Sequence, residues 1–195
     1  MYSQNIAEQL DGIVYFRKIL AVDRNPPIDL VVESGVVPRL VEFLTRQDHP
    51  NLQLEAAWAI TNIACGSKEQ VEVLIHQQTH LYLIQLLSIP HHEALREQAL
   101  WALGNISIDP SHARTLLQHD LISPILDIVG TGKPKLAAHE FPSLSSMRHV
   151  TWTCLNLLRA GPIDDVASVL LLILTELFES PDEDIILEIC KVTSC

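Results

Sequence analysis

Three tryptophan–asparagine pairs carry the residue types in this sequence that are best suited to recognition chemistry. Each pair has the spacing Trp-x-x-x-Asn, and the pairs are Trp58 with Asn62, Trp101 with Asn105, and Trp152 with Asn156. On a helix this spacing places the indole and the amide one turn apart on the same side. All three tryptophans of the 195-residue chain lie in this one position. The pattern therefore predicts a repeated helix with a repeated face.

The chemistry of such a face suits an extended basic peptide. An asparagine amide donates and accepts at once, so spaced asparagines can pair with a peptide backbone. Successive indoles leave slots for long aliphatic stems, and stacking of a lysine or arginine on a ring contributes about 0.5–2 kcal/mol. Carboxylates at Glu97 and Asp109 would then meet the cationic tips.

A purely structural explanation of these pairs competes with the binding explanation. Aromatic side chains at helical spacing usually pack in a core, and asparagine often makes only local hydrogen bonds. For a single copy, packing would be the better explanation. Three copies of the same pair at one helical position favour a binding face.

The helices that position these pairs are expected in a recurring order of short, medium and long. The long helices hold Trp58, Trp101 and Trp152, and the two later ones are 43 and 51 residues after the one before. We attribute the excess to a surface loop within residues 130–146, which contain Gly, Lys-Pro, Phe-Pro and Ser. The other helices are predicted near residues 3–21, 26–33, 39–44, 67–75, 81–87, 123–129 and 164–178, with a short one starting at 109–111 and a last one from 180 onward.

A period in the low forties with two or three helices per unit is typical of armadillo and HEAT repeats. We therefore predict an all-α, right-handed armadillo-repeat solenoid of about four three-helix units, the last incomplete. The long helices would line its concave wall. The chain is interpreted as one domain, 1–195, with a first long helix at 1–21 and units at 22–66, 67–109, 110–160 and 161–195.

Composition restricts the possible partners. The net charge of −11 argues against nucleic acid, whose phosphates require clustered Lys and Arg, and an acidic chain attracts basic partners instead. The most apolar run, Val166 to Phe178, is too short to span a bilayer, and no signal pattern begins the chain. The cysteines at 65, 154, 190 and 195 have no metal-binding spacing and are expected to be reduced, mostly packed thiols of an intracellular protein.

No motif in the sequence predicts catalysis, a metal or a cofactor. His76 and His80 have i, i+4 spacing, but Gln77 stands where a zinc hydrolase needs Glu, and no third ligand follows. We interpret both histidines as surface residues. The acidic run Asp182-Glu183-Asp184 is most simply a helix N-terminus that the helix dipole favours.

Two of the repeated stretches resemble the armadillo repeats of importin-α, the nuclear-import adaptor family. They are Trp-Ala-Ile-Thr-Asn-Ile-Ala-Cys-Gly at 58–66 and Arg-Glu-Gln-Ala-Leu-Trp-Ala-Leu-Gly-Asn-Ile at 96–106, and residues 16–29 are similar to that family's first repeat. The resemblance implies that the concave groove holds a lysine-rich nuclear localisation signal in extended form. Trp58, Trp101 and Trp152 would form the slots, and Asn62, Asn105 and Asn156 would hold the peptide backbone. Asp109 and the Gly66 carbonyl would receive the key lysine, flanked by Glu97 and Gln98.

The sequence departs from this family at several of the matching positions. Val71 stands where the family has a threonine that helps to bind the key lysine, and His149 replaces an asparagine beside the third slot. The last unit has Lys191 and Cys195 at the Trp and Asn positions. No basic arm precedes the repeats, so the resemblance implies neither importin-β recruitment nor self-inhibition by such an arm.

The sequence therefore predicts a non-enzymatic adaptor of the cytoplasm and nucleus that binds basic localisation signals. Its expected partners are cargo peptides rich in Lys and Arg, and neither nucleic acid nor membrane. The alternative is a scaffold or regulatory fragment that keeps the fold without competent cargo binding or importin-β recruitment. Val71, His149 and the unfinished last unit motivate this alternative.

Overall fold

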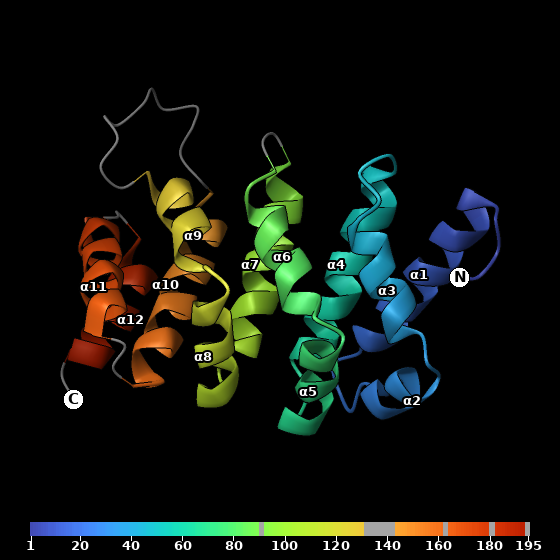
Figure 1. The fold of residues 1–195 in the computed structure, drawn as a ribbon, viewed down its shortest axis with the longest axis horizontal. Coiled ribbons are helices and arrows are strands. Elements are labelled where there is room, and N and C mark those ends of the chain that lie inside the picture. Colours follow the sequence, from blue (N-terminus) through green and yellow to red (C-terminus); the bar gives the residue numbers. More distant parts are fainter. Residues whose placement is uncertain (90–91, 131–142, 162–163, 180–181, 194–195) are drawn as a thin grey trace. The chain divides into compact units, whose positions relative to one another are not determined.

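The computed structural model describes residues 1–89, 92–130, 143–161, 164–179 and 182–193, and it contains twelve α-helices within these ranges (Figure 1). The chain divides into two compact units, Met1–Ile106 and Ser107–Cys195. None of the described helices combines the length and apolar character needed to cross a membrane.

The first unit holds seven helices, and α4 lies at its centre. Figure 1 shows α4 between α1 and α7, and α4 packs against both. The short and medium helices of each repeat lie between the long ones in sequence. In chain order the helices are α1 (Ile6–Leu20), α2 (Ile28–Glu33), α3 (Val37–Leu44), α4 (Pro50–Ala64), α5 (Lys68–His76), α6 (Thr79–Leu87) and α7 (Glu93–Ile106).

The second unit is organised around α10, which packs against α8, α11 and α12. It contains one more short–medium–long set and then two further helices. In chain order these are α8 (Pro110–Gln118), α9 (Ile122–Val129), α10 (Leu144–Arg159), α11 (Asp164–Phe178) and α12 (Glu183–Thr193).

Local sequence signals explain where these helices begin and end. Ser67 and Gln70 form a full capping box at the start of α5, because the Ser67 hydroxyl accepts from the Gln70 N–H while the Gln70 side chain accepts from the Ser67 N–H. Gly35 follows the C-terminus of α2 with φ +73°, a left-handed conformation that glycine adopts without steric cost. Pro50 opens α4 in the first turn, where its missing N–H costs nothing.

Small residues fill the contact surfaces of the long helices in the first unit. Ala56, Ala57 and Ala59 of α4 are fully buried, as are Ala99 and Ala102 of α7. Larger side chains, among them Ile60, Ile63, Leu100 and Leu103, complete the core. Short side chains let neighbouring helices approach closely, so most of the surface of α4 is covered. The part of α4 that stays exposed to solvent is a narrow stripe that includes Trp58.

The helices agree with those predicted from the sequence to within a few residues. Most of the expected loop, residues 131–142, lies outside the described residues, and so do the predicted start of the last helix at 180–181, Cys195, and the side chain of Lys191.

The capping box gives a direct test of the local fold. We expect Ser67→Ala to lower the free energy of unfolding by about 1 kcal/mol, because it leaves an N–H of the first turn of α5 without its acceptor. Chemical denaturation followed by circular dichroism measures the change. Ser88→Ala is the matched control, since Ser88 is exposed at the C-cap of α6 and its substitution is expected to change stability little. Equal effects of the two substitutions would contradict this role of Ser67.

Candidate functional site

The three tryptophan–asparagine pairs lie on the three long helices α4, α7 and α10, as the sequence predicts. The indole of Trp58 is 37% exposed, and those of Trp101 and Trp152 are half-buried. Asn62 is half-buried, whereas Asn105 and Asn156 are only 5% and 6% exposed. Each tryptophan therefore reaches the surface, while the asparagines of the second and third pairs are buried more deeply than Asn62.

The first pair already holds a basic residue of the chain itself. The Arg17 guanidinium carbon lies 4.3 Å from the centroid of the Trp58 ring, and its Nε forms an ion pair with Glu55 on the preceding turn of α4. The amide of Asn62 donates to the main-chain carbonyl of Arg17 at 3.4 Å. Neither Arg17 nor its partner Glu55 was among the site residues predicted from the sequence. Glu55 could have been found, because it lies on the same helical stripe as Trp58.

The amide of Asn105 connects its helix to the end of α4. Its Nδ2 donates to the Cys65 sulfur at 3.1 Å and to the Thr61 carbonyl at 3.5 Å. Partial burial raises the pKa of the Cys65 thiol above its ordinary value, and the bond from Asn105 acts in the opposite direction. The donor half of this amide is therefore used between helices.

The amide of Asn156 makes internal hydrogen bonds through both of its ends. Its Nδ2 donates to the Ser107 hydroxyl at 3.3 Å, and its Oδ1 accepts from Arg159 at 3.2 Å. By contrast, among the described residues no hydrogen bond reaches Oδ1 of Asn62 or Asn105. These two oxygens are the acceptors that the pairs can offer to the N–H groups of a ligand.

Gly66, Glu97 and Gln98 surround the second pair within the first unit. Gly66 follows α4 and is held by its N–H to the Ile63 carbonyl at 3.0 Å, and a Cβ there would overlap the Gln70 amide oxygen of the capping box. Glu97 and Gln98 are half-buried on α7. The Gln98 side-chain oxygen is buried without a described hydrogen-bond partner, so a ligand donor that reached it would satisfy it.

Asp109, the predicted lysine acceptor, is the N-cap of α8 in the second unit. Its Oδ1 accepts from the Ser111 N–H at 2.9 Å and from the Ser111 hydroxyl. The carboxylate therefore stabilises the start of α8, where the helix dipole favours an anion. Val71, which the sequence identifies as a departure from the resembled family, is 5% exposed and contributes to the core of the first unit.

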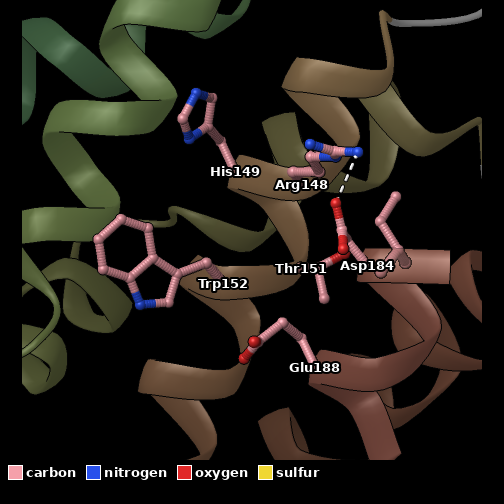
Figure 2. A pocket seen from close by; sticks show the side chains of 7 residues that line it. Arg148, His149, Thr151, Trp152, Asp184 and Glu188 are labelled. Carbon is pink, nitrogen blue, oxygen red and sulfur yellow. Dashed lines mark ion pairs between the residues drawn. The ribbon is translucent and has the colours of Figure 1, made fainter. Parts of the chain in front are cut away.

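A pocket of about 370 Å³ lies beside the third pair, between α10 and α12. Figure 2 shows His149 and Trp152 on the α10 side and Asp184 on α12, with the Glu188 carboxylate directed toward α10. Arg148 closes one end of the pocket through an ion pair with Asp184 at 2.9 Å. Trp152, Asp184 and Glu188 all line this pocket, and an indole and carboxylates are groups that suit a cationic side chain. The sequence predicted Trp152 but neither acid.

Two expectations about single residues are wrong, and a third is right but incomplete. His80 is 4% exposed and packs in the core, so it is not a surface histidine, although His76 is exposed and pairs with Glu72 at 3.5 Å. Cys65 and Cys190 are exposed residues rather than packed ones, although the Cys65 sulfur itself is partly covered. Asp182 does more than complement a helix dipole, since its hydrogen bonds with Arg148 hold the pKa of its carboxyl below the ordinary value.

Cys154 is the packed thiol that the sequence predicts. Burial raises the pKa of the Cys154 thiol to about 12, so this cysteine is a packed, neutral thiol. Within the described ranges, no three His, Cys, Asp or Glu side chains cluster as metal ligands would.

The hydrogen bonds of Asn105 predict that this residue stabilises the first unit. We expect Asn105→Ala to lower the free energy of unfolding by about 1–3 kcal/mol, because the Thr61 carbonyl and Cys65 lose a buried donor. Asn62→Ala is the comparison, since its amide is less buried and its bond is longer than the one to Cys65, and it should cost less. Urea denaturation of the two variants provides the measurement. A larger loss for Asn62→Ala would contradict the prediction.

Comparison with known proteins places these features in a family. Residues 24–65 match the armadillo/beta-catenin-like repeat, and residues 50–106 match a HEAT-like repeat. Over its whole length the chain is 39% identical to importin subunit alpha-2 of Arabidopsis thaliana and to importin subunit alpha-1a of Oryza sativa subsp. japonica. It spans 35% and 36% of the lengths of these two relatives.

Solved structures share the fold. A designed armadillo-repeat protein in complex with the peptide (KR)4 superposes with a TM-score of 0.80 at 21% identity, covering 98% of this chain and 77% of its own. Computationally designed armadillo-repeat proteins for modular peptide recognition give a TM-score of 0.82 at 20% identity, covering 98% and 76%. The predicted all-α armadillo-repeat fold is thus confirmed. The chain is an importin-α homologue along its full length.

Proposed function

We propose that this importin-α homologue binds lysine- and arginine-rich peptides of the nuclear-localisation type and acts as an import adaptor in the cytoplasm and nucleus. The observation that carries the proposal is the first tryptophan–asparagine pair, which already binds an arginine. There the guanidinium stacks on Trp58, its charge meets Glu55, and the Asn62 amide donates to the main-chain carbonyl of the same arginine. A basic residue of a ligand presents the same three groups.

The other two pairs also combine an indole and an amide with nearby acidic or polar side chains, but these side chains differ from one pair to the next. Trp101 and Asn105 stand beside Glu97 and Gln98, whose buried side-chain oxygen lacks a described donor. Trp152 lines the same pocket as Asp184 and Glu188. A stacked cation contributes about 0.5–2 kcal/mol per pair, so two or three occupied pairs would give a useful affinity. The net charge of −11 would speed the approach of a basic partner.

The comparisons support a basic peptide as ligand. A designed protein of the same fold is solved with the peptide (KR)4, and the curated relatives are importin subunits alpha. The relatives are about three times as long as this chain, so cargo import by this chain is part of the proposal.

A scaffold role without cargo binding is the second candidate. The observation that favours it is Asn156, whose amide hydrogen-bonds to Ser107 and Arg159 and so already uses both of its ends. In that case the asparagines would serve only to connect helices. The peptide titration below separates the two functions, because a scaffold of this kind would not bind the peptide.

The peptide titration is the main test of the proposal. We expect a fluorescein-labelled (KR)4 peptide to bind, and fluorescence anisotropy to show weaker binding as NaCl rises from about 0.05 to about 0.5 M, because salt screens exposed charges. Trp101→Ala should weaken binding by about thirtyfold, the effect of removing an aromatic anchor worth about 2 kcal/mol. Leu30→Ala, on the exposed surface of α2, is the control and should bind as the natural chain does. Absence of binding, or binding indifferent to Trp101, would refute the proposal.

The charge of Asp109 can be tested separately from its capping role. Asp109→Asn should cap α8 about as well as aspartate, because the two residues are comparable N-caps, but it removes the carboxylate charge. We expect it to weaken (KR)4 binding by about tenfold or more, the loss of one charge-assisted contact of about 1.5–3 kcal/mol, while the melting temperature stays nearly unchanged.

Two further variants control this test. Asp11→Asn removes an exposed charge on α1 and should leave affinity within about twofold of the natural value. Asp109→Ala should lose both affinity and about 1 kcal/mol of stability, since it loses the cap as well. If Asp109→Asn and Asp11→Asn have the same effect on affinity, Asp109 does not receive a basic side chain.

A further inference from the structure

The helix α11 exposes a stripe of side chains along its length. Leu171 and Phe178 are 53% and 49% exposed, and Thr175, which lies between them at helical spacing, is exposed as well. Large apolar side chains that are grouped at a protein surface often mark a place where another molecule binds. The stripe is therefore a candidate contact surface.

The earlier repeats show how such a stripe is used within this chain. α3 aligns with α11 through the pattern Leu-x-Glu, which lies at 40–42 in α3 and at 174–176 in α11. At the three stripe positions α3 has buried side chains, and α6, from the next repeat, packs against α3. In α9, which packs against α11, the side chains at these positions are half-buried. They are Val37, Val41 and Leu44 in α3, and Ile122, Leu126 and Val129 in α9. The stripe positions are thus where a medium helix contacts the next repeat.

The helix α12 shows the same difference from the earlier long helices. Leu187 is 56% exposed, and Cys190, three residues later on the same side, is also exposed. Cys190 comes directly before the tryptophan position, as Ala57 does in α4 and Thr151 does in α10, and these two residues are 0% and 1% exposed. α7 packs against α4, and α12 packs against α10. We call the surface formed by Leu171, Thr175, Phe178, Leu187 and Cys190 the α11–α12 face. The two helices that carry it pack against each other in the second unit (Figure 1).

The first helix of the chain, by contrast, is covered by the N-terminal residues. Met1 lies against α1, because a Cβ at Gly12 would come within 2.8 Å of the Met1 nitrogen. The Arg39 Nε donates to the Met1 carbonyl, and the Tyr2 hydroxyl donates to the Gly35 carbonyl, both at 3.2 Å. Terminal repeats of a solenoid need a polar or covered outer surface. α1 has such a cover, whereas the α11–α12 face presents exposed leucine and phenylalanine.

The charge around the α11–α12 face indicates which partner suits it. Residues 164–193 contain eight acidic residues and one lysine. Glu179 lies one helical turn after Thr175, Glu183 lies one turn before Leu187, and both glutamates are exposed. Two copies of the chain that met through this face would bring these carboxylates together, which is unfavourable. A partner with basic residues beside its apolar side chains would pair with the carboxylates instead.

We propose that the α11–α12 face binds an amphipathic helix of another protein, whose apolar stripe covers Leu171, Phe178 and Leu187 and whose edges carry lysine or arginine. Such a helix would lie against α11 and α12 as α6 and α7 lie against α3 and α4. Apolar residues at i, i+3, i+4 and i+7 of the partner would provide its contact stripe. This surface uses no residue of the three tryptophan–asparagine pairs, so the inference does not depend on the proposed function.

A model helix provides the test. The probe is a fluorescein-labelled peptide of about 18 leucine and lysine residues, with the leucines on one helical face. We expect fluorescence anisotropy to show that it binds. A control peptide of the same composition, with its leucines distributed around the helix, should bind at least about tenfold more weakly, because it cannot cover several apolar side chains at once. This comparison uses only the natural chain, so it does not depend on the folding of any variant.

Substitutions on the face locate the binding site. Leu171→Lys and Leu187→Lys should each weaken binding of the amphipathic peptide by about tenfold or more, because each removes an apolar contact and repels the basic edges. Leu30→Lys, at an exposed leucine of α2 in the first unit, is the matched control and should stay within about twofold of the natural chain. Circular dichroism of each variant would show that its helices are kept.

The outcomes distinguish this site from the proposed peptide site and from self-association. An excess of (KR)4 should leave the amphipathic peptide bound, and Trp101→Ala should not change its affinity. Displacement by (KR)4, equal binding of the two leucine–lysine peptides, or equal effects of Leu187→Lys and Leu30→Lys would overturn the inference. Light scattering tests the remaining occupant. If the natural chain is a dimer that Leu187→Lys converts to a monomer, a second copy covers the face and the inference is wrong.

Discussion

The close packing of α4 between α1 and α7 is the constraint on which the site depends. Alanines that are fully buried on α4 and α7 let these helices approach, and the isoleucines and leucines around them fill the remaining space. This packing occupies most of the circumference of α4. A tryptophan at position 58 is left with a partly exposed ring, and an asparagine one turn later lies at the border of the contact. The positions of the indole and the amide at the surface therefore follow from how the core is packed.

Because the asparagines lie at this border, they can hydrogen-bond both to a neighbouring helix and to a ligand. The Asn62 and Asn105 amides donate toward the neighbouring long helix, to the carbonyls of Arg17 and Thr61. Their oxygens remain as acceptors without a described partner. Sequence reasoning treated local hydrogen bonding and ligand binding as alternatives for these residues. In each of these two amides the nitrogen donates a hydrogen bond to a neighbouring helix. The oxygen of the same amide can still accept a hydrogen bond from a ligand, as the proposed function requires.

The sequence predicted the helices well because their signals are local. Hydrophobic spacing, the Ser67 capping box and the glycine at position 35 act within a few residues, and the observed helices follow them. The repeat itself also located the three indoles. The contact of Arg17 with Trp58 could not be predicted in this way, because it joins residues 41 positions apart on different helices. Periodicity shows that a residue faces outward but does not show which side chain will lie against it.

Contacts between helices also explain two features that the sequence did not predict, the burial of His80 and the partner of Asp182. His80 was expected at the surface because histidine is a polar residue type, yet the packing of α6 buries it. Asp182 was interpreted through its own helix, although Arg148 of α10 provides its main interaction.

The groups that would bind a ligand also stabilise the helices, so stability and recognition are coupled in this protein. Asp109 caps α8, the Asn105 amide holds the end of α4, and Glu55 neutralises Arg17. Truncating any of them to alanine would disturb the fold and the site together, and a loss of binding would then have two possible causes. Substitutions that keep the hydrogen bond and change only the charge distinguish the causes.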